Sequence, residues 1–198
     1  MKNENDNPLE LLKRSKEFKK QADEILGRSK LVEVLSRYGE VKFTGSYPLN
    51  LMMRPDLDVY AIAKENSKEK MLEVVQGIFS SCYFDEIRFT NYLDFYKDQD
   101  DHKGYYFQPL VKIGDNRWKL DIWLMAENRY EPHTEHFLEI LNKDPHANEK
   151  RLIILELKNH YKEGQKYKNN INGRKIYEAV LENEVKNVEE FERFLQRK

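Results

Sequence analysis

Two aspartates in one short segment are the residues of this sequence most able to do chemistry. Asp56 and Asp58 flank Leu57 at the entrance to a β-prone run that continues to Ile62. Residues i and i+2 of a strand point to the same face of its sheet, so the two carboxylates would lie side by side. Adjacent anions repel each other and favour a bound cation. Oxygen ligands of this kind, together with substrate phosphates, suit Mg²⁺ and phosphoryl transfer.

A second feature lies upstream, where Gly45-Ser46 follows the short β-prone stretch Val41 to Phe43. A glycine there lets backbone N–H groups approach an anion, and the serine hydroxyl can donate to a phosphate oxygen. Each feature also has an ordinary structural interpretation. An Asp-X-Asp pair often lies on a solvated strand end, and Gly-Ser is a common turn dipeptide. Their combination is much less common than either alone.

The segment from Phe43 to Ala63 resembles the nucleotidyltransferase superfamily, the fold family of DNA polymerase beta and of small antibiotic and minimal nucleotidyltransferases. Its signature is a hydrophobic residue, Gly-Ser or Gly-Gly, a gap of about nine to thirteen residues, and an acidic-hydrophobic-acidic-hydrophobic run. In this sequence Gly45-Ser46 is followed by the gap Tyr47 to Pro55 and then by Asp56-Leu57-Asp58-Val59. The resemblance covers roughly Leu31 to Met125.

The family's site is completed by a third acidic residue on a later strand. Asp94 and Asp121 both fit, because each lies between hydrophobic residues. We expect Asp121, which lies in the alternating run Trp118 to Met125 and shares its face with Lys119. A charged stretch typical of an exposed loop comes just after Asp94.

The resemblance implies a role for each of these residues. Asp56 and Asp58 would hold two Mg²⁺ ions, and Asp121 would hold one of them and help to deprotonate the acceptor hydroxyl. Gly45 and Ser46 would hold the β- and γ-phosphates of an NTP, with ATP the expected nucleotide. The reaction would transfer a nucleoside monophosphate to the acceptor and release pyrophosphate.

The sequence departs from the family pattern in a few places. Many minimal members carry Arg and Gly soon after Gly-Ser, and Ser just before the acidic pair; here those places hold Leu49, Asn50 and Pro55. Thr44 replaces the hydrophobic residue before Gly45. All three carboxylates are nevertheless present, so we expect an active enzyme. No separate general base is identified, and the candidates are Asp121, Glu127 and Glu156.

Hydrophobic periodicity indicates the elements that must position these residues. Helical spacing is found over Pro8 to Arg28, Leu31 to Tyr38 and, after a capping box at Asn66 and Glu69, up to Phe79. Strand-like segments are Val41 to Phe43, Leu57 to Ile62, Ile87 to Phe95, and a hairpin of Tyr105 to Ile113 and Trp118 to Met125 around Gly114-Asp115-Asn116. Helical candidates follow at Glu135 to Leu141, Asn148 to Tyr161, Arg174 to Leu181 and Val188 to Leu195.

This order predicts an α+β fold: a nucleotidyltransferase-like mixed β-sheet with flanking helices, followed by a C-terminal helical region. We place the α/β domain at residues 1–130 and the helical region at residues 131–198. Basic residues of the C-terminal half, Arg151 and Lys158 among them, are expected mainly on a solvated helical face.

The amino-acid composition limits which binding partners and which cellular location we expect. With 35% charged residues and a net charge of −1, the chain has no general positive field to hold a long nucleic acid. The single cysteine, Cys82, excludes an intrachain disulfide, fits a reducing cytoplasm, and is expected to be buried. The polar N-terminus and the lack of a long apolar stretch lead us to expect a cytoplasmic protein without membrane association.

The favoured function is therefore transfer of a nucleotide to a hydroxyl of a small molecule, with antibiotic-like compounds as the example from the family. One alternative is a protein side chain as acceptor, as in AMPylating minimal nucleotidyltransferases that act as antitoxins. Another is a nucleotide-binding module without turnover. A nucleic-acid polymerase or a tRNA-tailing enzyme is least favoured, and the oligomeric state is left open.

Overall fold

The computed structural model describes residues 7–95, 104–163 and 171–196. The chain divides into two compact units. The sheet unit comprises Lys20–Thr44 and Pro55–Pro132, and the helical unit comprises Met1–Lys19, Gly45–Arg54 and His133–Lys198. The chain passes between the units several times, and the domain boundary at residues 130 and 131 stays a prediction.

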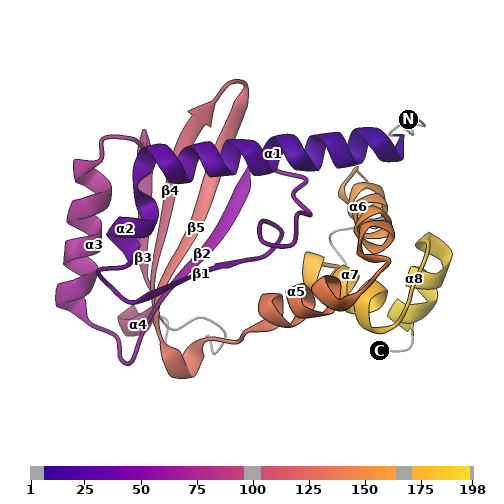
Figure 1. The fold of residues 1–198 in the computed structure, drawn as a ribbon. Helices are drawn as coiled ribbons and strands as arrows, with labels where there is room; N and C mark the ends of the chain where they lie inside the picture. The colour runs from indigo at the N-terminus through magenta and orange to yellow at the C-terminus, as the bar shows by residue number, and fades with distance from the viewer. Residues whose placement is uncertain (1–6, 96–103, 164–170, 197–198) are drawn as a thin grey trace. The chain divides into compact units, whose positions relative to one another are not determined.

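The sheet unit is built on one five-stranded sheet with the order β1-β2-β5-β4-β3 (Figure 1). The strands are β1 Glu40–Thr44, β2 Asp56–Ala63, β3 Glu86–Asn91, β4 Gly104–Ile113 and β5 Asn116–Ala126. β2 and β5 pair in parallel at the centre, and the other neighbours are antiparallel. The α+β class with a mixed sheet, predicted from the sequence, is confirmed.

One face of this sheet forms the core of the unit. Side chains alternate along each strand, so Leu57 and Val59 of β2 share a face with Leu120 and Ile122 of β5, and all four are fully buried. Several helices belong to this unit: the later part of α1 Pro8–Ser29, with α2 Leu31–Leu35, α3 Lys68–Ser80, α4 Tyr92–Phe95 and the 3-10 turn η1 Glu127–Arg129.

The start of β5 is fixed to α1 by a shared hydrogen-bond acceptor. Oε1 of Gln21 accepts from the Trp118 indole Nε1 and from the Asn116 side-chain amide, each at 3.0 Å. The indole is fully buried, so this acceptor satisfies a donor that would otherwise be costly to bury. The two-residue turn Gly114-Asp115 reverses the chain between β4 and β5, and Gly114 adopts the positive φ of 58° that such turns favour.

The start of α3 and the end of β3 differ from the sequence predictions. Ser67, not Asn66, caps α3: its hydroxyl accepts from the Lys70 amide at 3.2 Å, while Asn66 accepts from the Tyr38 hydroxyl. The extended segment ends at Asn91, because the Asn91 side chain accepts from the Asp94 amide and starts the short helix α4.

Cys82 is exposed, so the prediction of a buried thiol is wrong. α3 ends at Ser80, and Cys82 beyond it adopts a positive φ of 47° that takes the chain off the helical path and away from the core. None of the helices described is both long and apolar enough to cross a lipid bilayer.

The helical unit has a separate core. Its helices besides the first part of α1 are α5 His133–Lys143, α6 Ala147–Glu163, α7 Gly173–Tyr177, the π-helical turn η3 Glu178–Glu182 and α8 Val188–Gln196. Leu49 and Leu51 of the connecting segment are buried with Phe137, Ile154 and Phe191 of these helices. The segment that carries Gly45-Ser46 is therefore part of this second core.

Two basic side chains of α6 support that segment. Arg151 Nε donates to the Leu49 carbonyl at 3.0 Å, and Lys158 Nζ donates to the Leu51 carbonyl at 2.6 Å. Lys158 is buried and also donates to the Tyr177 hydroxyl at 3.2 Å. Lys158 is therefore an exception to the solvated helical face expected for most basic residues of the C-terminal half.

The alternation of the sheet gives a stability prediction. Leu120→Ala removes a fully buried side chain and should lower the free energy of unfolding by about 2–5 kcal/mol. Lys112→Ala, on the opposite face and exposed, should change it by less than about 0.5 kcal/mol. Urea unfolding of both variants measures the difference, and similar losses in the two variants would contradict the assignment of the faces.

Candidate active site

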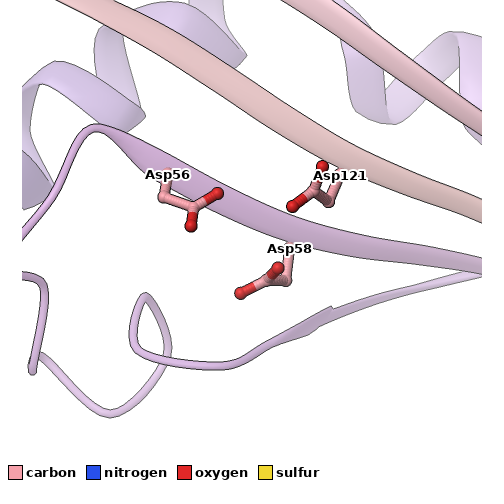
Figure 2. Close-up of side chains that lie close together, drawn as sticks. All are labelled: Asp56, Asp58 and Asp121. Carbon is pink, nitrogen blue, oxygen red and sulfur yellow. The ribbon is translucent and has the colours of Figure 1, made fainter. Parts of the chain in front are cut away.

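Three carboxylates converge on the sheet face opposite the core. Asp56 and Asp58 project from β2 and Asp121 from β5, and all three point into a common space (Figure 2). Asp58 is the direct register partner of Asp121 across the parallel pair. One oxygen from each carboxylate can be chosen so that the three lie within 4.8 Å of one another. Within the described ranges of the chain, this is the single group of acidic, histidine or cysteine side chains with such spacing.

Local sequence explains why β2 presents its acidic residues on this face. Leu57 and Val59 are fully buried on the core side, which fixes Asp56 and Asp58 on the other. The Lys119 amide donates to the Pro55 carbonyl at 3.0 Å, so pairing with β5 begins just before the first aspartate. The apolar residues thus set the register that brings the three carboxylates together.

Two side chains of β4 hold Asp121 by one oxygen. The Tyr106 hydroxyl donates to Asp121 Oδ1, and the Gln108 side-chain amide donates to the same oxygen at 3.1 Å. That amide nitrogen also lies 2.7 Å from the Tyr106 hydroxyl oxygen. Oδ1 therefore takes part in a network of neutral donors that fixes the direction of the carboxylate.

A lysine holds the other oxygen of Asp121. Lys119, two residues earlier on β5 and hence on the same face, places Nζ 2.6 Å from Asp121 Oδ2. The same ammonium lies 3.3 Å from Asp56 Oδ1 and so bridges the two strands. Its side chain is 38% exposed, which leaves it open to solvent on one side.

These contacts shift the ionisation of the groups in the site. Burial acts to raise the pKa of Asp121, but hydrogen bonds from Lys119, Tyr106 and Gln108 outweigh it and hold the pKa below its ordinary value. Burial acts to lower the pKa of Lys119, and the two carboxylates beside it raise that pKa overall. Burial, with the charges of Asp58 and Asp121, raises the pKa of Tyr60 to about 12. The structure thus favours an ionised Asp121, a charged Lys119 and a neutral Tyr60 at neutral pH.

Aromatic side chains continue the same face beyond the carboxylates. Trp123 is the register partner of both Tyr60 on β2 and Tyr106 on β4. Ring centroids lie 4.8 Å apart for Tyr106 and Trp123, 5.2 Å for Tyr92 and Trp123, and 5.6 Å for Tyr60 and Tyr130. The four tyrosines are partly exposed. We call Tyr60, Tyr92, Tyr106, Trp123 and Tyr130 the aromatic group.

The Gly45-Ser46 segment has a defined conformation within the helical unit. Gly45 has a positive φ of 66°, which glycine adopts without steric cost, and its N–H donates to the Thr134 hydroxyl at 3.1 Å. The Ser46 carbonyl accepts from the Leu51 amide at 2.9 Å, which closes a turn. Asn50 within the turn also has a positive φ, 59°. Phosphate binding by Gly45 and Ser46 stays a prediction.

The other carboxylates considered from the sequence are not members of this group. Asp94 is exposed on α4, where it accepts from the Asn91 side chain. Glu127 is exposed in η1, and Glu156 is exposed on α6 of the helical unit. Sequence reasoning gave no role to Lys119, Tyr106 or Gln108, although the two-residue spacing of Lys119 and Asp121 already placed them on one face.

The architecture is that of a nucleotidyltransferase-like fold. Among solved structures, the chain is similar to Cid1, an RNA terminal uridylyl transferase, with a TM-score of 0.51 and 19% sequence identity. The match covers 74% of this chain and 40% of the Cid1 chain, so this chain spans well under half the length of that neighbour. No family model matches the sequence, and no curated protein matches it.

The lowered pKa of Asp121 predicts an effect of acid on stability. An unfolded aspartate has a pKa of about 3.9, and the folded value is lower, so the stabilisation is present above that pH and is lost as pH falls through the folded pKa. The free energy of unfolding should therefore fall more steeply below about pH 5 in the wild type than in Asp121→Asn. Urea unfolding at several pH values, in the presence of EDTA, measures the two slopes.

Asp115→Asn, in the exposed β4–β5 turn, controls for removal of one surface carboxylate. If the free energy of unfolding fell with pH equally steeply in the wild type and in Asp121→Asn, the contacts of Asp121 would not perturb its ionisation.

Proposed function

We propose that this chain is a Mg²⁺-dependent nucleotidyltransferase that transfers a nucleoside monophosphate from an NTP, with ATP the expected donor, to a hydroxyl of a small-molecule acceptor and releases pyrophosphate. The observation that carries the proposal is the convergence of Asp56, Asp58 and Asp121 on one face of a nucleotidyltransferase-like sheet. The proposed location is the cytoplasm.

The donor set fits a hard divalent cation. Three carboxylates supply only oxygen ligands, and their oxygens are close enough to share one or two ions. Asp56 and Asp58 would hold both ions, and Asp121 would hold one. When bound, the metal would polarise the reacting phosphate and lower the pKa of the attacking hydroxyl.

The protein groups around the carboxylates have roles of their own in this proposal. Tyr106 and Gln108 keep Asp121 in one orientation, and the lowered pKa keeps it ionised at neutral pH. An ionised Asp121 is able to accept the proton of the acceptor hydroxyl. Gly45 and Ser46 are proposed to bind the β- and γ-phosphates through the backbone N–H and the hydroxyl.

The aromatic group supports a small acceptor that contains a ring. Tyr60 follows Asp58 by two residues on β2, so an acceptor lying on its partly exposed ring would be next to the carboxylates. Aromatic faces bind flat rings and the apolar faces of sugars, and they attract cations. A neutral or cationic hydroxylated ring compound is therefore the favoured acceptor.

Two other acceptors are the alternatives. A protein side chain would make the chain an AMPylating enzyme. An RNA end is suggested by the similarity to Cid1, but the net charge of −1 gives little general attraction for a long nucleic acid. A nucleotide-binding module without turnover is a further alternative, and the three intact carboxylates argue against it.

A labelling experiment tests the proposal. Purified protein is incubated with Mg²⁺ and each α-labelled NTP, together with aminoglycosides, lincosamides, a short RNA or no added acceptor. Label should appear on a small molecule, and Asp56→Ala and Asp58→Ala should each reduce it by at least about a hundredfold. Asp115→Ala, which removes an exposed carboxylate of the same unit, should keep wild-type activity.

The other outcomes separate the alternatives. Label on the protein itself indicates AMPylation, and label on RNA indicates a terminal transferase. Mg²⁺-dependent NTP binding without transfer, lost in both aspartate variants, indicates an acceptor outside the panel or a binding module. If no NTP binds in the presence of Mg²⁺, the active-site assignment is wrong.

The aromatic group gives a second prediction for the same reaction. Tyr60→Ala should raise the KM for the acceptor about two- to tenfold, the equivalent of 0.5–1.5 kcal/mol for one aromatic contact. The KM for the NTP should change little. Tyr60→Phe keeps the ring and should retain the wild-type KM for the acceptor. Steady-state kinetics on both substrates measure the split, and an unchanged acceptor KM in Tyr60→Ala would exclude this ring from the acceptor site.

A further inference from the structure

We infer that the Lys119 ammonium occupies part of the metal-binding position between Asp56 and Asp121. The ammonium must therefore move away before a divalent ion binds there. Lys119 would then set the metal affinity of the site without being a metal ligand. Because it concerns the same three carboxylates, this role of Lys119 rests on the proposed function.

The two oxygens of Asp121 are used differently. Oδ1 accepts hydrogen bonds from Tyr106 and Gln108, both on β4. Oδ2 contacts the Lys119 ammonium at 2.6 Å. Since the β4 side chains already engage Oδ1, Oδ2 is the oxygen with more capacity for a metal ion. It is also the oxygen that Lys119 holds.

The second contact of Lys119 is with the other strand of the site. Nζ lies 3.3 Å from Asp56 Oδ1, an oxygen that is itself buried. The ammonium therefore bridges an oxygen of β2 and an oxygen of β5, as a metal shared by these aspartates would. In this position it reduces the repulsion between the two carboxylates in the metal-free protein.

Electrostatic repulsion disfavours the simultaneous presence of the Lys119 ammonium and a divalent ion between Asp56 and Asp121. Mg²⁺ binds carboxylate oxygens at about 2.1 Å, so an ion on Oδ2 would lie within about 5 Å of an ammonium that stayed in contact, where positive charges repel strongly. Lys119 has a route away, because its side chain is 38% exposed and its four-carbon stem is flexible. Tyr106 and Gln108 can meanwhile keep Asp121 in place.

Competition of this kind has a measurable consequence. If only a fraction of the molecules have the ammonium away from the carboxylates, the apparent Kd for the metal is raised by the inverse of that fraction. Removing the charge of Lys119 should therefore tighten metal binding. A lysine that merely organised the carboxylates for the metal would have the opposite effect, because its loss would weaken metal binding.

The test is direct metal binding by the full chain in the absence of NTP. Free Mn²⁺ is followed by electron paramagnetic resonance during titration of wild type, Lys119→Met, Lys119→Gln and Lys119→Arg. The two neutral variants should bind Mn²⁺ with a Kd about tenfold lower than wild type, which corresponds to an ammonium in place about nine-tenths of the time. Lys119→Arg keeps the charge and should have a Kd no lower than wild type. Thermal melts establish that each variant is folded.

Lys112→Met is the matched control for charge. Lys112 is an exposed lysine on the same sheet face, on β4, and its loss should change the Kd by less than about twofold. A Kd that is unchanged or raised in both neutral Lys119 variants would overturn the proposed competition between the ammonium and the metal. If Mn²⁺ still bound tightly in that case, the proposed function would be unaffected. An equal decrease in Lys112→Met would also overturn it, by showing a general charge effect. If no variant binds Mn²⁺, the metal centre and the proposed function fail together with this role of Lys119.

Discussion

The parallel pairing of β2 with β5 is the constraint on which the candidate site depends. It places Asp58 opposite Asp121 and Asp56 opposite Lys119, so three acidic side chains and one basic one meet on one face. Like charges at this spacing oppose the pairing. The apolar core face of the same strands offsets that repulsion. Leu57, Val59 and Leu120 are fully buried there, and their burial holds the two strands in register.

On the polar face, side chains of β4 and of β5 itself offset the repulsion between the carboxylates. Tyr106 and Gln108 donate to Asp121, and Lys119 places a positive charge between Asp121 and Asp56. The result is a carboxylate that stays ionised although it is largely buried. Such an arrangement keeps negative charge concentrated in one place, which is what cation binding requires and what folding alone would not favour.

Much of this arrangement follows from the period of the strands. Asp56 with Asp58, and Lys119 with Asp121, could be assigned to common faces from two-residue spacing alone, and the apolar alternation of Trp118 to Met125 separated Asp121 from Asp94. The contacts of Asp121 with β4 required the hairpin register. A turn of three residues, Gly114 to Asn116, was expected, whereas the structure has Asn116 paired with Ile113 around a two-residue turn. A shift of the hairpin register by one residue moves every side chain of β4 to the other face, so the partners of Asp121 could not be named from the sequence.

The contacts of Arg151 and Lys158 could not be predicted either. These side chains donate to the carbonyls of Leu49 and Leu51, about a hundred residues earlier in the chain, and no local sequence pattern acts over such a separation.

The interleaving of the two units along the chain limits how this protein can be divided. The helical unit draws on three separate stretches, and the buried residues Leu49, Leu51 and Met53 come from the short middle one. A fragment that stopped near residue 130 would retain these apolar side chains but would lose Phe137, Ile154 and Phe191, which bury them. The unit is thus assembled only when the last part of the chain is available, so its core has to form after, and not during, synthesis of the sheet strands.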